Sequence, residues 1–222
     1  MRRPSLETAM VDVSPEYSRR SIRLEGYDYS QEGMYFVTIC VFNHVCSFGH
    51  IDNDVVVLNV FGKTAFDAWK SIPEHFPGVE LDEFVVMPNH VHGILCFTED
   101  ERRATHASPL LPGIQAGKPK GPGKRSLGAV IGSYKSAVTC CINKKQLLSG
   151  TVVWQRNYFE HIIRDGKSYD KISEYIATNP ERWDSDIENP DRKGTDEFHK
   201  WLTSFSSIKG GCSGPPLPKE PE

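Results

Sequence analysis

Hydrophobic positions along the chain follow a strand period first and a helical period next. Residues 34–42 form a run of β-branched and aromatic side chains, which predicts a strand buried on both faces. Residues 55–58 predict a short edge strand. From Asn59 onward, hydrophobic residues recur at helical spacing up to Ile72, with Asn59 as the N-cap and Pro73 near the end. We interpret this region as the first crossover helix.

The strand period returns after this helix. Residues 79–87 and 90–97 predict two strands, joined as a hairpin by the turn at Pro88 and Asn89. The segment that follows, 98–124, is rich in Pro, Gly, Ala and Lys and has no period. It is predicted to be a flexible basic insertion.

The last part of the predicted domain is again helical for most of its length. Helical spacing runs over 126–148, with Ser126 as the cap, a short extended segment follows at 151–154, and a further helix is predicted over 168–178, stopped before Pro180. The resulting order, strand, helix, strand, strand, helix, strand, is that of the split βαβ ferredoxin-like fold. The fold class is therefore α+β: an antiparallel sheet with helices on one face, plus a C-terminal helix.

Composition supports one domain. The 222 residues are 38% hydrophobic, and we place the folded domain at 21–186, between a flexible N-terminus, 1–20, and a C-terminal extension, 187–222, largely disordered at its end. The sequence has no signal peptide and no apolar run near ~20 residues, so no contact with a membrane is predicted. Six cysteines without a CxxC pair favour the cytoplasm.

Charge is unevenly distributed along the chain. The net charge of −3 argues against a simple binder of polyanions, but Glu160 is the only acid between Arg102 and Arg164. This basic middle could be an ordinary solvated surface, or it could contact nucleic-acid phosphates. The candidate DNA-binding residues are Arg125, Lys135, Arg156 and Arg164.

Two histidines open the second strand of the predicted hairpin. Alternate side chains of a strand lie on one face, so His90 and His92 can hold one metal ion together. The pair alone is equally compatible with two imidazoles on a solvated or hydrogen-bonded strand face.

Tyr175 and Asn179 are four residues apart and share one face of the last predicted helix. Taken alone, they could be a core aromatic and a helix-stopping residue. With His90 and His92, they form a site in which two imidazoles and an amide oxygen bind Mg²⁺ or Mn²⁺. A tyrosine hydroxyl beside such a metal can attack a phosphodiester and form a covalent phosphotyrosine.

Three sequence words carry a resemblance to a known family. They are VVMPNHVH at 85–92, WQRNYFEHIIR at 154–164 and YIATNP at 175–180. In this order and spacing the chain resembles the REP-associated tyrosine transposases, within the single-tyrosine HUH (IS200-like) superfamily. The resemblance covers about residues 20 to 186.

The resemblance implies a ferredoxin-like endonuclease domain in which His90 and His92 bind a divalent cation and Tyr175 is the nucleophile. Asn179 stands where relatives have a third polar ligand. The implied substrate is single-stranded DNA near imperfect hairpins, nicked and rejoined through a 5′-phosphotyrosine. A homodimer is also compatible with the resemblance, because related transposases can exchange the tyrosine helix between subunits.

Some alternatives stay open from the sequence. Tyr158 and Tyr169 are rival nucleophiles, although Tyr169 lies on a different helical face from Tyr175. A domesticated hairpin-binding protein that no longer cuts is the leading alternative function. A metal hydrolase with water as nucleophile is disfavoured, because no carboxylate accompanies the histidines within 87–95.

Overall fold

A four-stranded antiparallel sheet forms the centre of the fold. The computed structural model describes residues 27–98, 125–146 and 150–204. The strands are β1 (Gly33–Cys40), β4 (Val79–Val86), β5 (His90–Phe97) and β6 (Phe159–Ile163), in the order β4-β5-β1-β6. The two strands that pair with β1, β5 and β6, both run antiparallel to it. This order is that of the predicted split βαβ fold, and the predicted fold class is confirmed.

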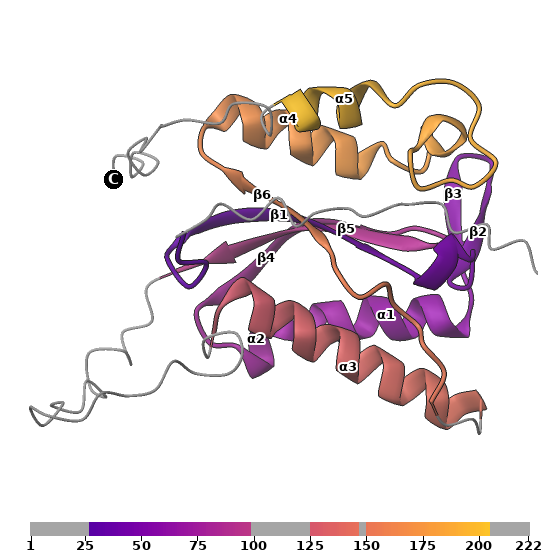
Figure 1. Ribbon diagram of the computed structural model, residues 1–222, viewed down its shortest axis with the longest axis horizontal. Helices are drawn as coiled ribbons and strands as arrows, with labels where there is room; N and C mark the ends of the chain where they lie inside the picture. The colour runs from indigo at the N-terminus through magenta and orange to yellow at the C-terminus, as the bar shows by residue number, and fades with distance from the viewer. Residues whose placement is uncertain (1–26, 99–124, 147–149, 205–222) are drawn as a thin grey trace, which may run out of the picture.

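Helices cover both faces of the sheet (Figure 1). On one face lie α1 (Val60–Lys70), the short α2 (Ile72–His75) and α3 (Leu127–Gln146). On the other face lie α4 (Gly166–Ala177) and α5 (Glu197–Ser204). The predicted C-terminal helix therefore packs on the face of the sheet opposite the crossover helices.

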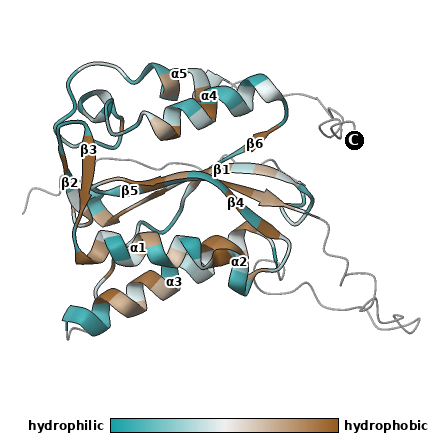
Figure 2. Cartoon of the chain, turned by 180° about the vertical axis from the view of Figure 1, so that it is seen from behind, coloured by the Kyte–Doolittle hydropathy of each residue, from teal (hydrophilic) through white to brown (hydrophobic). Residues whose placement is uncertain are grey.

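The alternation along β1 divides the core in two. Tyr35, Val37 and Ile39 belong to the larger hydrophobic cluster, which also contains the buried hydrophobic side chains of α1 and α3. Phe36 belongs to a second cluster, which contains the buried hydrophobic side chains of α4 and α5. Hydrophobic positions accordingly run along the strands between the two helical layers (Figure 2). A strand flanked on both sides in this way explains the continuous apolar run in the sequence.

The helix caps follow the sequence closely. The Asn59 side chain accepts hydrogen bonds from the backbone N–H groups of Phe61 and Gly62, which confirms it as the N-cap of α1. The Ser126 hydroxyl accepts a hydrogen bond from the N–H of Ala129 at the start of α3. Asp165 caps α4 by accepting from the N–H of Ser168, so α4 begins slightly earlier than predicted.

One strand prediction was wrong, and another was right in its bounds but not in its partner. Residues 151–154 are not the last strand of the sheet, because this segment meets the end of β1 only through a bridge between Val41 and Trp154. The fourth strand is β6, which pairs with Met34 to Thr38 of β1. The predicted edge strand at 55–58 is β3 (Val55–Leu58), but it pairs only with β2 (Gly49–Asp52) and forms a separate hairpin.

A glycine in β5 leaves room for the largest side chain of the core. A Cβ on Gly93 would lie 2.4 Å from Cζ2 of Trp69, which is fully buried. We therefore expect Gly93→Ala to lower the free energy of unfolding by about 1–3 kcal/mol, measured by urea denaturation. Gly132→Ala is the control, because its Cβ meets nothing within 4 Å and the change should stabilise α3 by about 0.5–1 kcal/mol. Equal effects at the two glycines would contradict this interpretation.

No helix among the described residues is long and apolar enough to cross a membrane. The predicted flexible N-terminus at 1–20, nearly all of the predicted insertion at 98–124, and the end of the predicted extension beyond residue 204 lie outside the described residues. The described part of that extension contains α5, which packs on the second cluster and so lies against the predicted domain.

Candidate metal and tyrosine site

His90 is the first residue of β5, and its two ring nitrogens have different surroundings. Its Nδ1 lies 2.9 Å from the side-chain oxygen of Asn89, which can only accept, so Nδ1 carries the proton. The Asn89 amide is itself oriented by donating to the carbonyl oxygens of His44 and Glu188, at 3.0 and 2.6 Å. Nε2 of His90 is buried and has no hydrogen-bond partner among the described residues. It is therefore presented as a lone-pair donor inside the protein.

His92 lies one pleat further along β5, on the same face. The two imidazole rings have centroids 4.3 Å apart. Nδ1 of His92 lies 2.9 Å from the hydroxyl of Thr38 on the neighbouring strand, which holds the ring in place. Nε2 is 3.4 Å from the hydroxyl oxygen of Tyr175. An outer hydrogen bond on one ring nitrogen, with the other nitrogen directed into the site, is the arrangement typical of metal-binding histidines.

Tyr175 of α4 extends its hydroxyl into this group. The side chain is only 4% exposed, and its ring stacks on Phe198 of α5 with centroids 3.6 Å apart and an angle of 8° between the planes. The hydroxyl donates a hydrogen bond to Oδ2 of Asp186 at 3.0 Å. Burial, and next the charge of Asp186, raises the pKa of Tyr175 well above its ordinary value. The phenol is thus held protonated in the isolated protein.

Asp186 is the acidic member of the site. Its Oδ2 also accepts from the Asn179 amide at 2.8 Å and lies 4.0 Å from Nε2 of His92. Its Oδ1 accepts from the N–H of Glu188 at 2.7 Å, which fixes the carboxylate orientation. Burial alone would raise the pKa of Asp186, but the neighbouring histidines and the Asn179 hydrogen bond outweigh it and hold this pKa below its usual range.

The donor set fits a divalent cation. Ligand atoms of His90, His92 and Asp186 all lie within 4.8 Å of one another, and all three residues are buried. Oδ1 of Asn179 is buried and lacks a hydrogen-bond partner among the described residues, as does Nε2 of His90. Two orphaned acceptors beside a carboxylate are costly unless something positive binds between them. Imidazole, amide and carboxylate donors suit Mg²⁺, Mn²⁺ and related cations.

The burial of His90 has a consequence for stability in the metal-free protein. Burial, and next the charge of His92, lowers the pKa of His90 from 6.5 to about 4, against the opposing charges of Asp186 and Glu188. Between these values the unfolded chain binds more protons than the folded one, so stability falls as the pH is lowered. From pH 6.5 to pH 5 we expect His90 to reduce the free energy of unfolding by about 1.5 kcal/mol.

Urea denaturation in the presence of a chelator measures this dependence. His90→Gln should make the decline below pH 6.5 shallower, because one of two contributing histidines among the described residues is removed; burial also lowers the pKa of His161 to about 4, and that contribution remains. The exposed His50 provides the matched control, and His50→Gln should leave the decline unchanged. An identical decline in His90→Gln and in the unmodified chain would contradict the prediction.

Comparison with known proteins gives two relatives by sequence. An uncharacterized protein of Haemophilus influenzae (strain ATCC 51907 / DSM 11121 / KW20 / Rd) is 44% identical over 170 residues, which are 77% of this chain and 92% of that protein. The chain belongs to the family of this protein. A second protein of the same organism, named "Putative REP-associated tyrosine transposase", is 25% identical over 154 residues, which are 69% of this chain and 73% of its own length.

The resemblance to REP-associated tyrosine transposases is thus confirmed. Among solved structures, a REP-associated tyrosine transposase bound to a REP hairpin aligns with a TM-score of 0.47 at 19% identity, covering 72% of this chain and 73% of that one. No family model matches the chain.

The rival tyrosines make contacts with other residues. The Tyr169 hydroxyl donates to both carboxylate oxygens of Asp82, each at 3.2 Å. Tyr158 packs against the larger cluster, with the ammonium of Lys135 5.9 Å from its ring centroid. Of the three candidates, Tyr175 is the one whose hydroxyl meets His92.

The candidate DNA-binding residues differ in their exposure and in their contacts within the protein. The Lys135 ammonium is occupied within the protein, because it donates to the carbonyl oxygens of Gln155, Arg156 and Asn157 at 2.7, 3.4 and 3.0 Å. Burial lowers its pKa to about 8. Lys135 therefore organises the 155–157 loop. Arg156 and Arg164 are exposed, and Arg125 is half-buried before α3.

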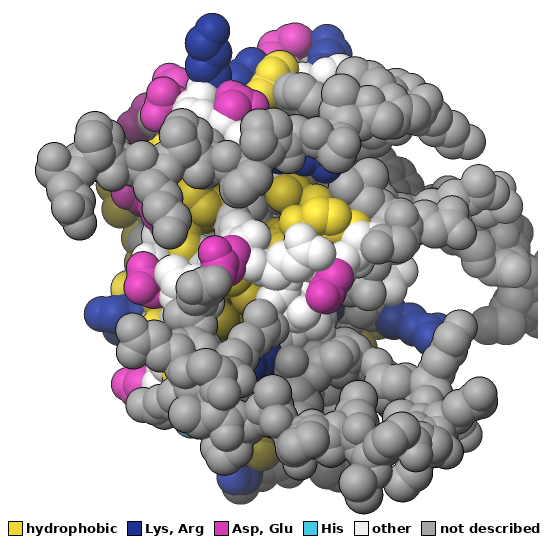
Figure 3. All heavy atoms as spheres, turned by 90° about the vertical axis from the view of Figure 1, so that its left-hand side faces the viewer, with side chains coloured by type: hydrophobic (Ala, Val, Ile, Leu, Met, Phe, Trp, Pro, Cys, Tyr) yellow, Lys and Arg dark blue, Asp and Glu magenta, His cyan; other side chains and the backbone are white. Residues whose placement is uncertain are grey.

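One face of the molecule illustrates how the charges are mixed. Figure 3 shows acidic and basic side chains interspersed around exposed hydrophobic ones in the described part of this face. The basic residues of the predicted insertion, from Arg102 to Lys124, lie outside the described residues.

Three members of the site were not predicted from the sequence: Asp186, Asn89 and Thr38. Asp186 follows Asn179 by seven residues in an irregular segment, where no periodicity indicates the direction of a side chain. Asn89 was predicted only as a turn residue. Its position directly before His90 could have indicated that its side chain contacts the imidazole. Thr38 is a cross-strand neighbour of His92, which becomes visible only once the register of β1 and β5 is known.

Proposed function

We propose that this protein is a metal-assisted transposase that nicks and rejoins single-stranded DNA at hairpin-forming repeats, with Tyr175 as the nucleophile. The observation that carries the proposal is the position of the Tyr175 hydroxyl, 3.4 Å from Nε2 of His92 and 3.0 Å from Oδ2 of Asp186. A structural tyrosine needs no such neighbours. The three shared sequence words and the similarity to a named REP-associated tyrosine transposase support the class of substrate.

The proposed reaction is a transesterification. The Tyr175 oxygen forms a bond to phosphorus while the bond from phosphorus to the 3′ oxygen of the preceding nucleotide breaks. The phenol, oriented by its hydrogen bond to Asp186, loses its proton to solvent, and the departing 3′ oxygen takes a proton from solvent. The 5′ end remains on Tyr175 as a phosphodiester, so the reverse attack by a 3′ hydroxyl rejoins strands without ATP.

We propose His90, His92, Asn179 and Asp186 as the residues that hold Mg²⁺ or Mn²⁺. When bound, the cation withdraws charge from the scissile phosphate and favours the ionised phenol. Asp186 adds a carboxylate to the three ligands that were predicted from the sequence. Asn179 contributes its oxygen while its amide nitrogen stays on Asp186.

Asp186 also favours a second candidate function, a metal hydrolase with water as nucleophile, because a buried carboxylate does accompany the histidines. The third candidate function is that of a domesticated protein that binds DNA hairpins and no longer cuts them. One assay separates them. A hairpin-forming single-stranded DNA, labelled on the side 3′ to the cleavage position, is incubated with the protein and Mn²⁺.

A protein–DNA adduct that survives boiling in detergent is the result expected for the transposase. Cleaved product without any adduct would favour the hydrolase. Binding without cleavage, across hairpins of different sequence and with both Mg²⁺ and Mn²⁺, would favour the binder. Gel filtration of the active species tests the predicted homodimer. The alternative is an active monomer, because Tyr175 reaches the histidines of its own chain.

A further inference from the structure

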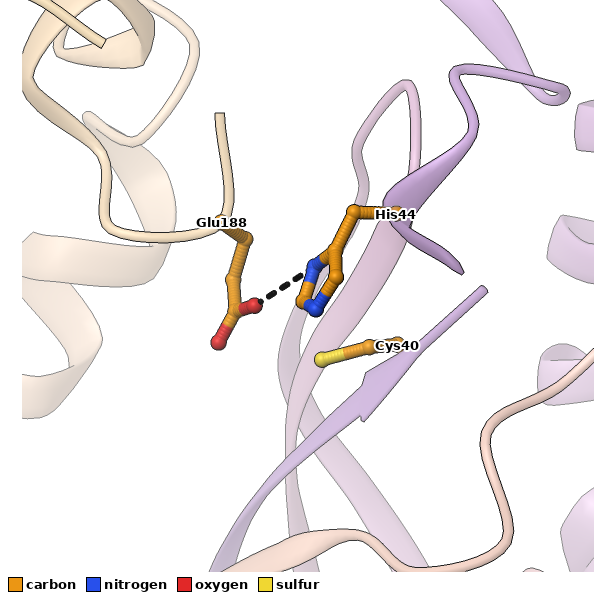
Figure 4. A group of neighbouring side chains, drawn as sticks. All are labelled: Cys40, His44 and Glu188. Carbon is orange, nitrogen blue, oxygen red and sulfur yellow. Dashed lines mark ion pairs between the residues drawn. The ribbon is translucent and has the colours of Figure 1, made fainter. Parts of the chain in front are cut away.

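A second group of metal-binding side chains lies next to the tyrosine site. Cys40 ends β1, His44 ends the 3-10 turn Phe42–His44, and Glu188 lies in the segment between the 3-10 turn Trp183–Ser185 and α5. Figure 4 shows the thiol of Cys40 and the carboxylate of Glu188 directed toward the imidazole of His44. Ligand atoms of the three residues lie within 4.8 Å of one another. Cys40 is 4% exposed and Glu188 2%.

The geometry of this group is held from several directions. Nδ1 of His44 lies 3.0 Å from Oε2 of Glu188. The other ring nitrogen, Nε2, lies 2.6 Å from the amide nitrogen of Gln155, and a flip of this amide presents its oxygen as the acceptor that an Nε2–H requires. The Asn89 amide donates to the carbonyl oxygens of both His44 and Glu188. The group therefore has an outer layer of hydrogen bonds of the kind that orients metal ligands.

We propose that Cys40, His44 and Glu188 form a zinc site distinct from the site at His90 and His92. Thiolate, imidazole and carboxylate are the three ligand types that proteins use for Zn²⁺, and a thiolate ligand disfavours Mg²⁺ and Mn²⁺. On binding, Cys40 loses its thiol proton to solvent. Nδ1 of His44 and one oxygen of Glu188 complete three protein ligands, and water takes the fourth position. Zinc also compensates the buried charge of the Glu188 carboxylate.

The zinc site ties the end of the sheet to the segment that carries Asp186. Glu188 is two residues from Asp186, whose Oδ1 accepts from the Glu188 N–H. Cys40 is the register partner of His90 across β1 and β5. Zinc at Cys40, His44 and Glu188 therefore fixes the acidic segment against the sheet. This inference does not depend on DNA cleavage and is tested without it.

Cobalt(II) is the probe, because a thiolate bound to it gives an intense near-ultraviolet charge-transfer band, while nitrogen and oxygen ligands alone do not. The full chain is made metal-free and titrated with Co²⁺, and Zn²⁺ is then added. We expect a thiolate band that Zn²⁺ removes. Cys40→Ser should abolish the band. Cys46→Ser, at an exposed cysteine nearby in the sequence, is the matched control and should retain it.

Further outcomes are decisive as well. Glu188→Gln should retain the band but weaken Co²⁺ binding about 10- to 100-fold, and circular dichroism checks that each variant is folded. If Cys40→Ser does not fold, the affinity of Glu188→Gln decides. The absence of a band in the unmodified chain, a band retained in Cys40→Ser, or unchanged affinity in Glu188→Gln would each overturn the proposal. The site at His90 and His92 cannot imitate the band, because it contains no sulfur.

Discussion

Tyr175→Phe is expected to abolish the covalent DNA adduct and to leave hairpin binding within about fivefold, since one buried hydrogen bond is worth only about 1 kcal/mol. The variant removes the hydroxyl oxygen that attacks phosphorus and keeps the ring that stacks on Phe198. The loss of chemistry is complete rather than partial, because no other tyrosine hydroxyl in the described residues lies against His92. Gel electrophoresis in detergent measures the adduct, and fluorescence anisotropy measures binding.

Tyr169→Phe provides a matched control for this experiment. It makes the same chemical change on the same helix, but the hydroxyl it removes is bonded to Asp82. Adduct formation should persist there. An adduct of undiminished yield in Tyr175→Phe would exclude Tyr175 as the nucleophile and redirect attention to Tyr158.

The fold could be predicted from the sequence where local rules and packing agree. The apolar run of β1, the hairpin of β4 and β5, and the caps at Asn59 and Ser126 all follow from residue type and period. The prediction failed at β6, where Phe159–Ile163 includes Glu160 and His161 and does not read as a clear strand. Pairing with β1 stabilises this strand, and a partner distant in sequence leaves no local signal.

The site could be predicted only in part, for a related reason. His90 and His92 are paired by the strand period, and Tyr175 is directed by α4, so elements of regular structure determine their directions; Asn179 lies in the turn directly after α4. Asp186 lies in an irregular segment. Its direction depends on the hydrogen bond from the Glu188 N–H and on contacts with Tyr175 and Asn179, which exist only in the folded chain.

Replacing Asp186 by asparagine is expected to weaken Mn²⁺ binding about 10- to 100-fold and to slow adduct formation by at least about 100-fold. The substitution keeps the shape of the side chain but removes its charge. Because the pKa of Asp186 is held low, its carboxylate is a weak base. We therefore expect its main contributions to be cation binding and orientation of the Tyr175 hydroxyl. Isothermal titration measures Mn²⁺ affinity, and a quenched time course measures the adduct rate.

Asp186 could instead slow the reaction, and the same Mn²⁺ titration and adduct time course distinguish this role from cation binding. Asp186 also raises the pKa of Tyr175, so a carboxylate that only restrains the phenol would slow the reaction. In that case Asp186→Asn would form the adduct faster, with Mn²⁺ affinity unchanged. Asp184→Asn is the control, since it makes the same change at an exposed acid two residues earlier and should alter neither quantity. Because a ligand must affect affinity and a restraint need not, the Mn²⁺ titration decides between the two roles even if both variants react slowly.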